Sequence, residues 1–77
     1  MKTIEINGVE VRTNLGGKYP FSDGSSKKTM VMELPNWGES DERMLHRLVK
    51  AGYKTVTFYY MATRVKGYYD LIAFCRR

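Results

Sequence analysis

A chain of 77 residues with one cysteine, one histidine and a formal net charge of +5 allows a single small domain, residues 1–77. Cys75 has no partner for an internal disulfide, and Cys75 and His46 alone cannot complete a structural zinc site. No apolar run approaches the roughly 20 residues that cross a bilayer, and the N-terminus lacks the apolar core of a signal peptide. We therefore expect a cytoplasmic protein with no membrane partner.

The excess positive charge lies entirely in the second half of the chain. Residues 1–40 contain five basic and five acidic residues, whereas residues 41–77 contain eight basic and three acidic ones. This asymmetry is typical of a protein with an anionic partner, nucleic acid first. A net charge of this size is also ordinary for a small soluble domain, so both interpretations stay open.

Two alternating segments at the start of the chain flank Asn7-Gly8. Asn-Gly is the strongest short signal for a β-hairpin, because a type I′ turn needs a positive φ at both central residues. In the register that this turn sets, the apolar side chains of both strands share one face. They are Ile4, Ile6, Val9 and Val11.

Residues 13–28 have no clear hydrophobic period and contain several glycine and proline residues. We expect a long connection here, and such connections in small domains are often functional. Tyr19 and Phe21 either anchor this segment in the core or belong to a binding loop.

A third strand and a helix are expected next. Residues 30–34 alternate in polarity up to Pro35. Ser40 is a good N-cap, acidic residues follow it in the first turn, and Gly52 is a typical residue for ending a helix. The helix is therefore expected at about 41–51, and its apolar stripe consists of Leu45, Leu48 and Val49, with Met44 beside it.

Two aromatic and β-branched segments, 53–64 and 68–77, predict a second hairpin with its turn at Lys66-Gly67. A two-residue turn there places Met61 opposite Ile72. One face of this hairpin is uniformly apolar and is expected to carry the helix. It comprises Val56, Phe58, Tyr60, Ala62, Leu71, Ala73 and Cys75.

The second face of this hairpin holds a smaller apolar cluster, Tyr59, Met61, Ile72 and Phe74. One helix cannot cover both faces of a sheet. Either the first hairpin folds over the cluster, or the cluster stays exposed as an interface. A slip of one residue would exchange the faces of one strand, so the register decides this assignment.

The element order is β-β-β-α-β-β. We expect an α+β domain with an antiparallel β-sheet of about five strands and one helix packed on one face. A partly closed, barrel-like sheet is the alternative.

The residue inventory predicts a protein that is not an enzyme and has no catalytic, metal or cofactor site. His46 lies in the middle of the expected helix, where Glu42 forms a local pair with it. The segment 24–28 contains glycine and lysines but lacks the spacing of a P-loop. A small RNase that uses only Arg, Lys and Tyr is a third hypothesis, although helices usually come first in such proteins.

Two surfaces are candidate binding sites. The first is a basic ridge on the outer side of the helix, where the spacing i, i+4, i+7 aligns Arg43, Arg47 and Lys50. The second is an apolar anchor on the second face of the last hairpin, formed by Tyr59, Met61 and Phe74 and bordered by Arg76. Aromatic, Met and Arg residues are enriched in interface cores. The simpler alternatives are a solvated helix surface and a sheet face buried in a homodimer or under the first hairpin.

The first functional hypothesis is a non-enzymatic binding protein that docks on a protein or nucleoprotein complex. Small phage-encoded inhibitors, including anti-CRISPR proteins, share this size, this lack of catalytic groups and this mixture of hairpins and one helix. That likeness is one of type, and no motif carries it. The second hypothesis is a small basic nucleic-acid-binding domain that places the same cations on phosphates.

Overall fold

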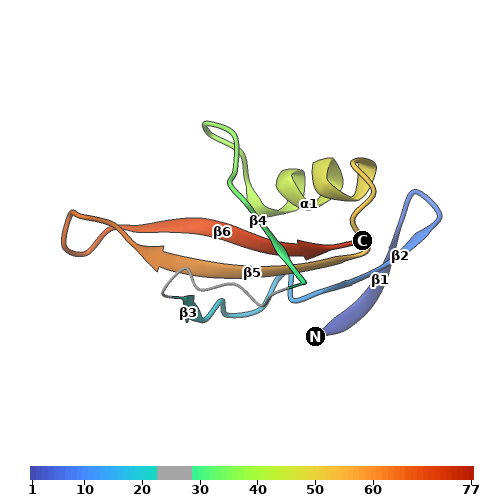
Figure 1. Cartoon of the computed structure of the whole chain (residues 1–77), viewed down its shortest axis with the longest axis horizontal. Coiled ribbons are helices and arrows are strands. Elements are labelled where there is room, and N and C mark those ends of the chain that lie inside the picture. The colour runs from blue at the N-terminus through green and yellow to red at the C-terminus, as the bar shows by residue number, and fades with distance from the viewer. Residues whose placement is uncertain (23–28) are drawn as a thin grey trace.

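The computed structural model describes residues 1–22 and 29–77 (Figure 1). The described part contains one helix, α1 (Asp41–Lys50). It also contains the strands β1 (Lys2–Ile6), β2 (Val9–Thr13), β3 (Phe21–Ser22), β4 (Val31–Glu33), β5 (Thr55–Ala62) and β6 (Tyr69–Arg76). These strands form a single sheet in the order β1-β2-β5-β6-β4, and β3 also pairs with β5. The α+β class is confirmed.

The sheet is mixed, which corrects the prediction of a wholly antiparallel one. β2 runs parallel to the first part of β5, with Arg12 opposite Thr55, and β3 runs parallel to the last part, with Phe21 opposite Tyr60. Strand β3 was not expected, because it is only two residues long and has no period of its own. Hairpin motifs in a sequence predict antiparallel pairing of strands that follow one another. Parallel pairing joins segments that are distant in sequence, so these motifs do not indicate it.

The side chain of Asn14 fills the gap between β2 and β3 along the edge of β5. Its amide nitrogen donates to the carbonyl oxygen of Phe58 at 3.0 Å, and its amide oxygen accepts from the Phe58 N–H at 2.7 Å. A side-chain amide thus replaces a backbone peptide in the ladder. The edge of β5 is thereby paired at Phe58 between its two short partners.

The first hairpin forms in the predicted register, with Ile6 opposite Val9 and a positive φ at Asn7 and Gly8. It does not fold over the second face of the last hairpin. Instead β2 extends the sheet beside β5, and Val11 is completely buried in the core on the helix side. This corrects the idea that the first hairpin could act as a cover.

The helix matches its predicted bounds within one residue. The Ser40 hydroxyl accepts from the Arg43 N–H at 3.2 Å, and Gly52 ends the helix with φ +104°. Arg77 donates to the carbonyl oxygen of Ala51 at 2.7 Å and lies over the ring of Tyr53. The helix packs on the predicted apolar face of the last hairpin, and the core there comprises Met44, Leu45, Leu48, Val49, Val56, Phe58, Ala73 and Cys75.

The pairing within the last hairpin differs from the prediction by two residues. Ile72 lies opposite Tyr59 rather than opposite Met61. The Thr63 N–H donates to the carbonyl oxygen of Tyr68, so extra residues are accommodated on the β5 side of the turn. A shift of two residues leaves every side chain on its predicted face, because side chains alternate with a period of two.

On the second face of this hairpin, Ile72 and Phe74 are buried, whereas Tyr59 and Met61 are half-buried. Edge strand β4 flanks this part of the sheet, and its residue Met32 pairs with Phe74. Ile72 and Phe74 are thus inaccessible, whereas Tyr59 and Met61 keep part of their surface open, and the first hairpin does not cover them.

Within the described residues, no helix has both the length and the apolar character needed to cross a bilayer.

Candidate functional site

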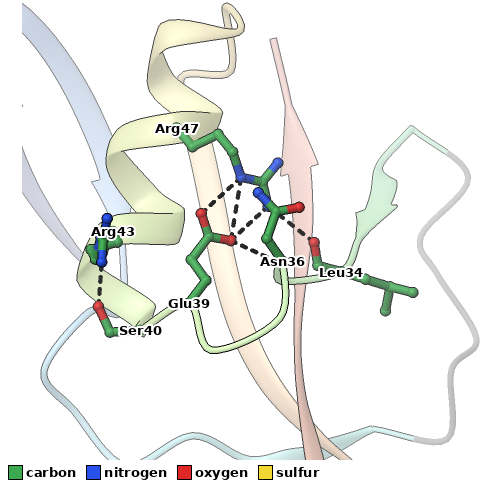
Figure 2. Close-up of polar contacts among 6 residues, drawn as sticks. All are labelled: Leu34, Asn36, Glu39, Ser40, Arg43 and Arg47. Atoms are coloured by element: carbon green, nitrogen blue, oxygen red, sulfur yellow. Dashed lines mark hydrogen bonds and ion pairs between the residues drawn. The ribbon is translucent and has the colours of Figure 1, made fainter.

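Arg47, in the last part of α1, forms a two-point ion pair with Glu39, which lies just before the helix (Figure 2). Its Nε donates to Glu39 Oε2 at 2.9 Å, and its Nη2 donates to Glu39 Oε1 at 2.9 Å. The same Nη2 donates to the carbonyl oxygen of Leu34 at 3.0 Å. Arg47 is thus engaged inside the protein, whereas the other two residues of the expected basic ridge, Arg43 and Lys50, are exposed.

The pKa shifts of Glu39 and Arg47 both favour the charged form of the side chain. The hydrogen bond from Arg47 is the main cause that lowers the pKa of Glu39 below its ordinary value of 4.5, while burial opposes it. The bond to Glu39 is likewise the main cause that raises the pKa of Arg47. Two-point pairing of guanidinium with carboxylate also fixes geometry, so the pair sets the position of the chain before the helix.

The ion pair holds a tight turn at residues 36–39. The Glu39 N–H donates to the carbonyl oxygen of Asn36 at 3.0 Å, and Gly38 has φ +74°. The Glu39 carboxylate also accepts from the Asn36 N–H at 2.9 Å. We call residues 36–39 the Trp37 turn, since it presents Trp37 fully to solvent, with a relative accessibility of 102%.

A second exposed apolar feature lies on the helix side of β5 and β6. Helix α1 has 10 residues and so is about 15 Å long, whereas each of these strands has 8 residues and is about 26 Å long. The hairpin therefore projects beyond the helix (Figure 1). On the uncovered part, the residues Phe21, Tyr60 and Tyr69 are 65%, 36% and 52% exposed.

We call Phe21, Tyr60 and Tyr69 the distal aromatic cluster. The centroids of the Phe21 and Tyr69 rings are 4.8 Å apart, and those of Phe21 and Tyr60 are 6.3 Å apart. A shallow hollow lined by Leu34, Pro35, Asp70 and Leu71 lies between the base of the Trp37 turn and this hairpin. The two apolar features therefore border the same side of the sheet.

Tyr19 links the distal aromatic cluster to the helix. Its ring packs against Phe58 at 5.3 Å and against Tyr60 at 5.6 Å, and its hydroxyl donates to Asp41 Oδ2 at 2.7 Å. Burial, and then the bond to Asp41, raise the pKa of Tyr19 to about 12. Of the two aromatic residues in the long connection, Tyr19 is an anchor and Phe21 is exposed.

The predicted apolar anchor is divided by the fold. Phe74 is only 4% exposed, and Tyr59 packs edge-on against it at 5.4 Å. Tyr59 and Met61 are half-buried, and Arg76 is exposed at the end of β6. The structure thus separates Phe74 from solvent and leaves Arg76 accessible.

The groups capable of chemistry are few and dispersed among the described residues. The Cys75 thiol is buried, and burial is the main cause that raises its pKa to about 12, so it is protonated at neutral pH. His46 is exposed on α1. Within the described part of the chain, no group of three His, Cys, Asp or Glu side chains is arranged to hold a metal ion. Segment 24–28, which was compared with a P-loop, lies outside the described residues.

Sequence reasoning missed the Trp37 turn and the distal aromatic cluster as candidate sites. A tryptophan in a turn ahead of a helix was visible in the sequence, and so was the difference in length between the helix and the last two strands. Comparisons of the chain with protein-family models, with curated proteins and with solved structures found no match. The site is therefore interpreted from its geometry.

Proposed function

We propose that this protein is a binding domain that docks on another protein through the Trp37 turn and the distal aromatic cluster. The observation that carries the proposal is the complete exposure of Trp37 on a turn that an ion pair and two further hydrogen bonds hold in place. Nothing within the described chain packs on this ring to explain its presence.

The energetics favour a binding role for Trp37. Burying a tryptophan removes about 150–250 Å² from water, which corresponds to about 4–6 kcal/mol before the costs of association. Tryptophan, tyrosine and arginine are the residue types most enriched in interface hot spots. Because the turn is already ordered, little conformational entropy is lost on docking.

The charges around this surface favour an acidic partner. Arg43 lines a small hollow together with Trp37 and the rest of the turn. Arg64 and Lys66 lie exposed at the end of the hairpin that carries the distal aromatic cluster. With a net charge of +5, these cations would accelerate encounter with an acidic protein surface. An inhibitor of a host nucleoprotein is the narrower form of this proposal.

The test is capture of partners from a lysate of the native host, with and without nuclease, using the wild type, Trp37→Ala and Tyr68→Ala. Tyr68 is an exposed aromatic residue outside both named features and serves as the matched control. We expect Trp37→Ala to reduce recovery of the main partner at least about tenfold, the loss of one hot spot. Tyr68→Ala should retain it. A partner recovered equally by Trp37→Ala and the wild type would contradict the proposal.

A further inference from the structure

Two arginines lie in one row across the second face of the sheet, opposite the helix. Arg12 of β2 pairs with Thr55 of β5, and Thr55 pairs with Arg76 of β6. Partners in a ladder point to the same side of a sheet, and neighbouring strands are about 4.8 Å apart. The Cα atoms of Arg12 and Arg76 are therefore about 10 Å apart, with a threonine hydroxyl between the two side chains.

Neither arginine forms an ion pair with a carboxylate of residues 1–22 or 29–77. Both side chains are exposed, and the ion pair of Arg47 with Glu39 is the only one among the residues that the structure describes. Glu10, two residues along β2, and its partner Glu5 share this face but lie toward the Asn7-Gly8 turn. No carboxylate of the described residues lies between the two arginines, so they create a local positive potential that attracts an anion. Guanidinium groups bind phosphate through two parallel hydrogen bonds.

A groove continues from this row along β5. Its lining residues are Met1, Arg12, Met30, Thr55, Thr57, Tyr59 and Arg76. The Thr57 hydroxyl lies 3.5 Å from the sulfur of Met1, another lining residue. Tyr59 is half-buried beside Phe74, so its position is fixed by packing. The arginines flank one end of β5, and the tyrosine ring lies four residues further along this strand, about 13 Å away. This spacing suits a phosphate and a base from neighbouring nucleotides of one strand.

We propose that this groove binds single-stranded nucleic acid, with backbone phosphates at Arg12 and Arg76 and a base against Tyr59. Proteins that bind single strands combine a positive groove for the backbone with aromatic side chains on which bases stack. A duplex keeps its bases stacked and cannot offer one to a half-buried ring. This inference is independent of the docking proposal, because the row of Arg12 and Arg76 lies on the face of the sheet opposite the helix, whereas the Trp37 turn directly precedes the helix.

Fluorescence anisotropy with a labelled oligothymidylate of about 12 nucleotides, within the usual site size of such grooves, tests the proposal. The variant Arg12→Gln/Arg76→Gln is compared with Arg43→Gln/Lys50→Gln, which removes the same charge from the helix. We expect the groove variant to bind at least about tenfold more weakly at low salt. The slope of log Kobs against log salt should fall by about 1.4, since each lost phosphate contact on a single strand contributes about 0.7. The helix variant should keep the wild-type slope.

A second variant tests the role of the ring. Tyr59→Leu should weaken binding by roughly 5- to 150-fold, the range measured for loss of one stacked base. Tyr68→Leu is the matched control and should bind as the wild type does. Circular dichroism and urea unfolding show whether Tyr59→Leu retains the fold. If Tyr59→Leu is unfolded, the variant Arg12→Gln/Arg76→Gln still tests the proposal.

Four outcomes would overturn the proposal. They are no binding by the wild type at low salt, equal loss in the groove and helix variants, equal competition by duplex DNA, and equal competition by polyglutamate. The last would assign the groove to an acidic protein segment. Trp37→Ala should bind the oligonucleotide as the wild type does, so failure here is distinguishable from failure of the docking proposal.

Discussion

The guanidinium of Arg47 and the carboxylate of Glu39 join the helix to the turn in front of it through two hydrogen bonds of 2.9 Å (Figure 2). The turn carries Trp37, so an arginine of the helix fixes the position of an exposed aromatic ring that lies two residues before Glu39. In the sequence Arg47 looks like part of a basic binding surface, whereas in the structure it positions Trp37.

Removing this ion pair should increase the mobility of the Trp37 turn while lowering the stability of the whole domain only modestly. We expect Arg47→Ala to lower the free energy of unfolding by about 1–2 kcal/mol, because Glu39 and the Leu34 carbonyl lose a charged donor and the pair is partly exposed. Trp37 is the single tryptophan of the chain, so its fluorescence anisotropy reports the mobility of the turn. The anisotropy should fall in Arg47→Ala and stay unchanged in Lys50→Ala. Equal anisotropy in Arg47→Ala and the wild type would show that the ion pair does not order the turn.

The same pair should make stability depend on pH in the acid range. The pKa of Glu39 is lower in the folded protein than its ordinary value of 4.5. Its contribution to stability is therefore complete above about pH 4.5 and is lost as the pH falls through the folded pKa. Urea unfolding at several pH values should show wild type and Glu39→Gln differing most near neutral pH and converging in acid. A difference that is constant with pH would contradict this account.

The bridge from Asn14 to Phe58 should be a large contributor to stability for a single side chain. Asn14→Ala leaves both the N–H and the carbonyl of Phe58 without their partner in a partly buried position. We expect a loss of about 2–3 kcal/mol in the free energy of unfolding. Hydrogen exchange at the Phe58 amide should accelerate. Asn14→Asp is the informative comparison, because it keeps the acceptor for that amide and removes only the donor. Unchanged exchange in Asn14→Ala would exclude the bridge.

The Tyr19 hydroxyl should lose its proton only at high pH, and its bond to Asp41 should stabilise the connection that follows β2. Its pKa is raised to about 12 in the folded protein, so the stability it confers is complete below its ordinary value of 10 and is lost as the pH rises through 12. Absorbance titration of phenolate formation should show a component near pH 12 that disappears in Tyr19→Phe. That variant keeps the ring on Phe58 and should lose about 1 kcal/mol, the typical net value of one hydrogen bond. If the phenolate lost in Tyr19→Phe were one that forms near pH 10 rather than near 12, the raised pKa of Tyr19 and the role of its bond to Asp41 would be contradicted.

The long-range features of the candidate sites could not be read along the chain. The row of Arg12, Thr55 and Arg76 exists because β2 pairs in parallel with β5, across more than half of the chain. The pairing of Arg47 with Glu39 depends on the path of the turn, and the burial of Phe74 depends on the layers around β6. Each of these facts rests on contacts whose loop-closure entropy is offset only when the whole domain folds.

By itself the sequence determined the elements that short-range physics controls. Asn7-Gly8 set the first hairpin, Ser40 and Gly52 bounded the helix, and alternation assigned the faces of the last hairpin even though its pairing was two residues off. Only the tertiary structure decided how far the helix reaches along β5 and β6. A 10-residue helix cannot cover strands about 26 Å long, and this mismatch leaves the distal aromatic cluster open to solvent.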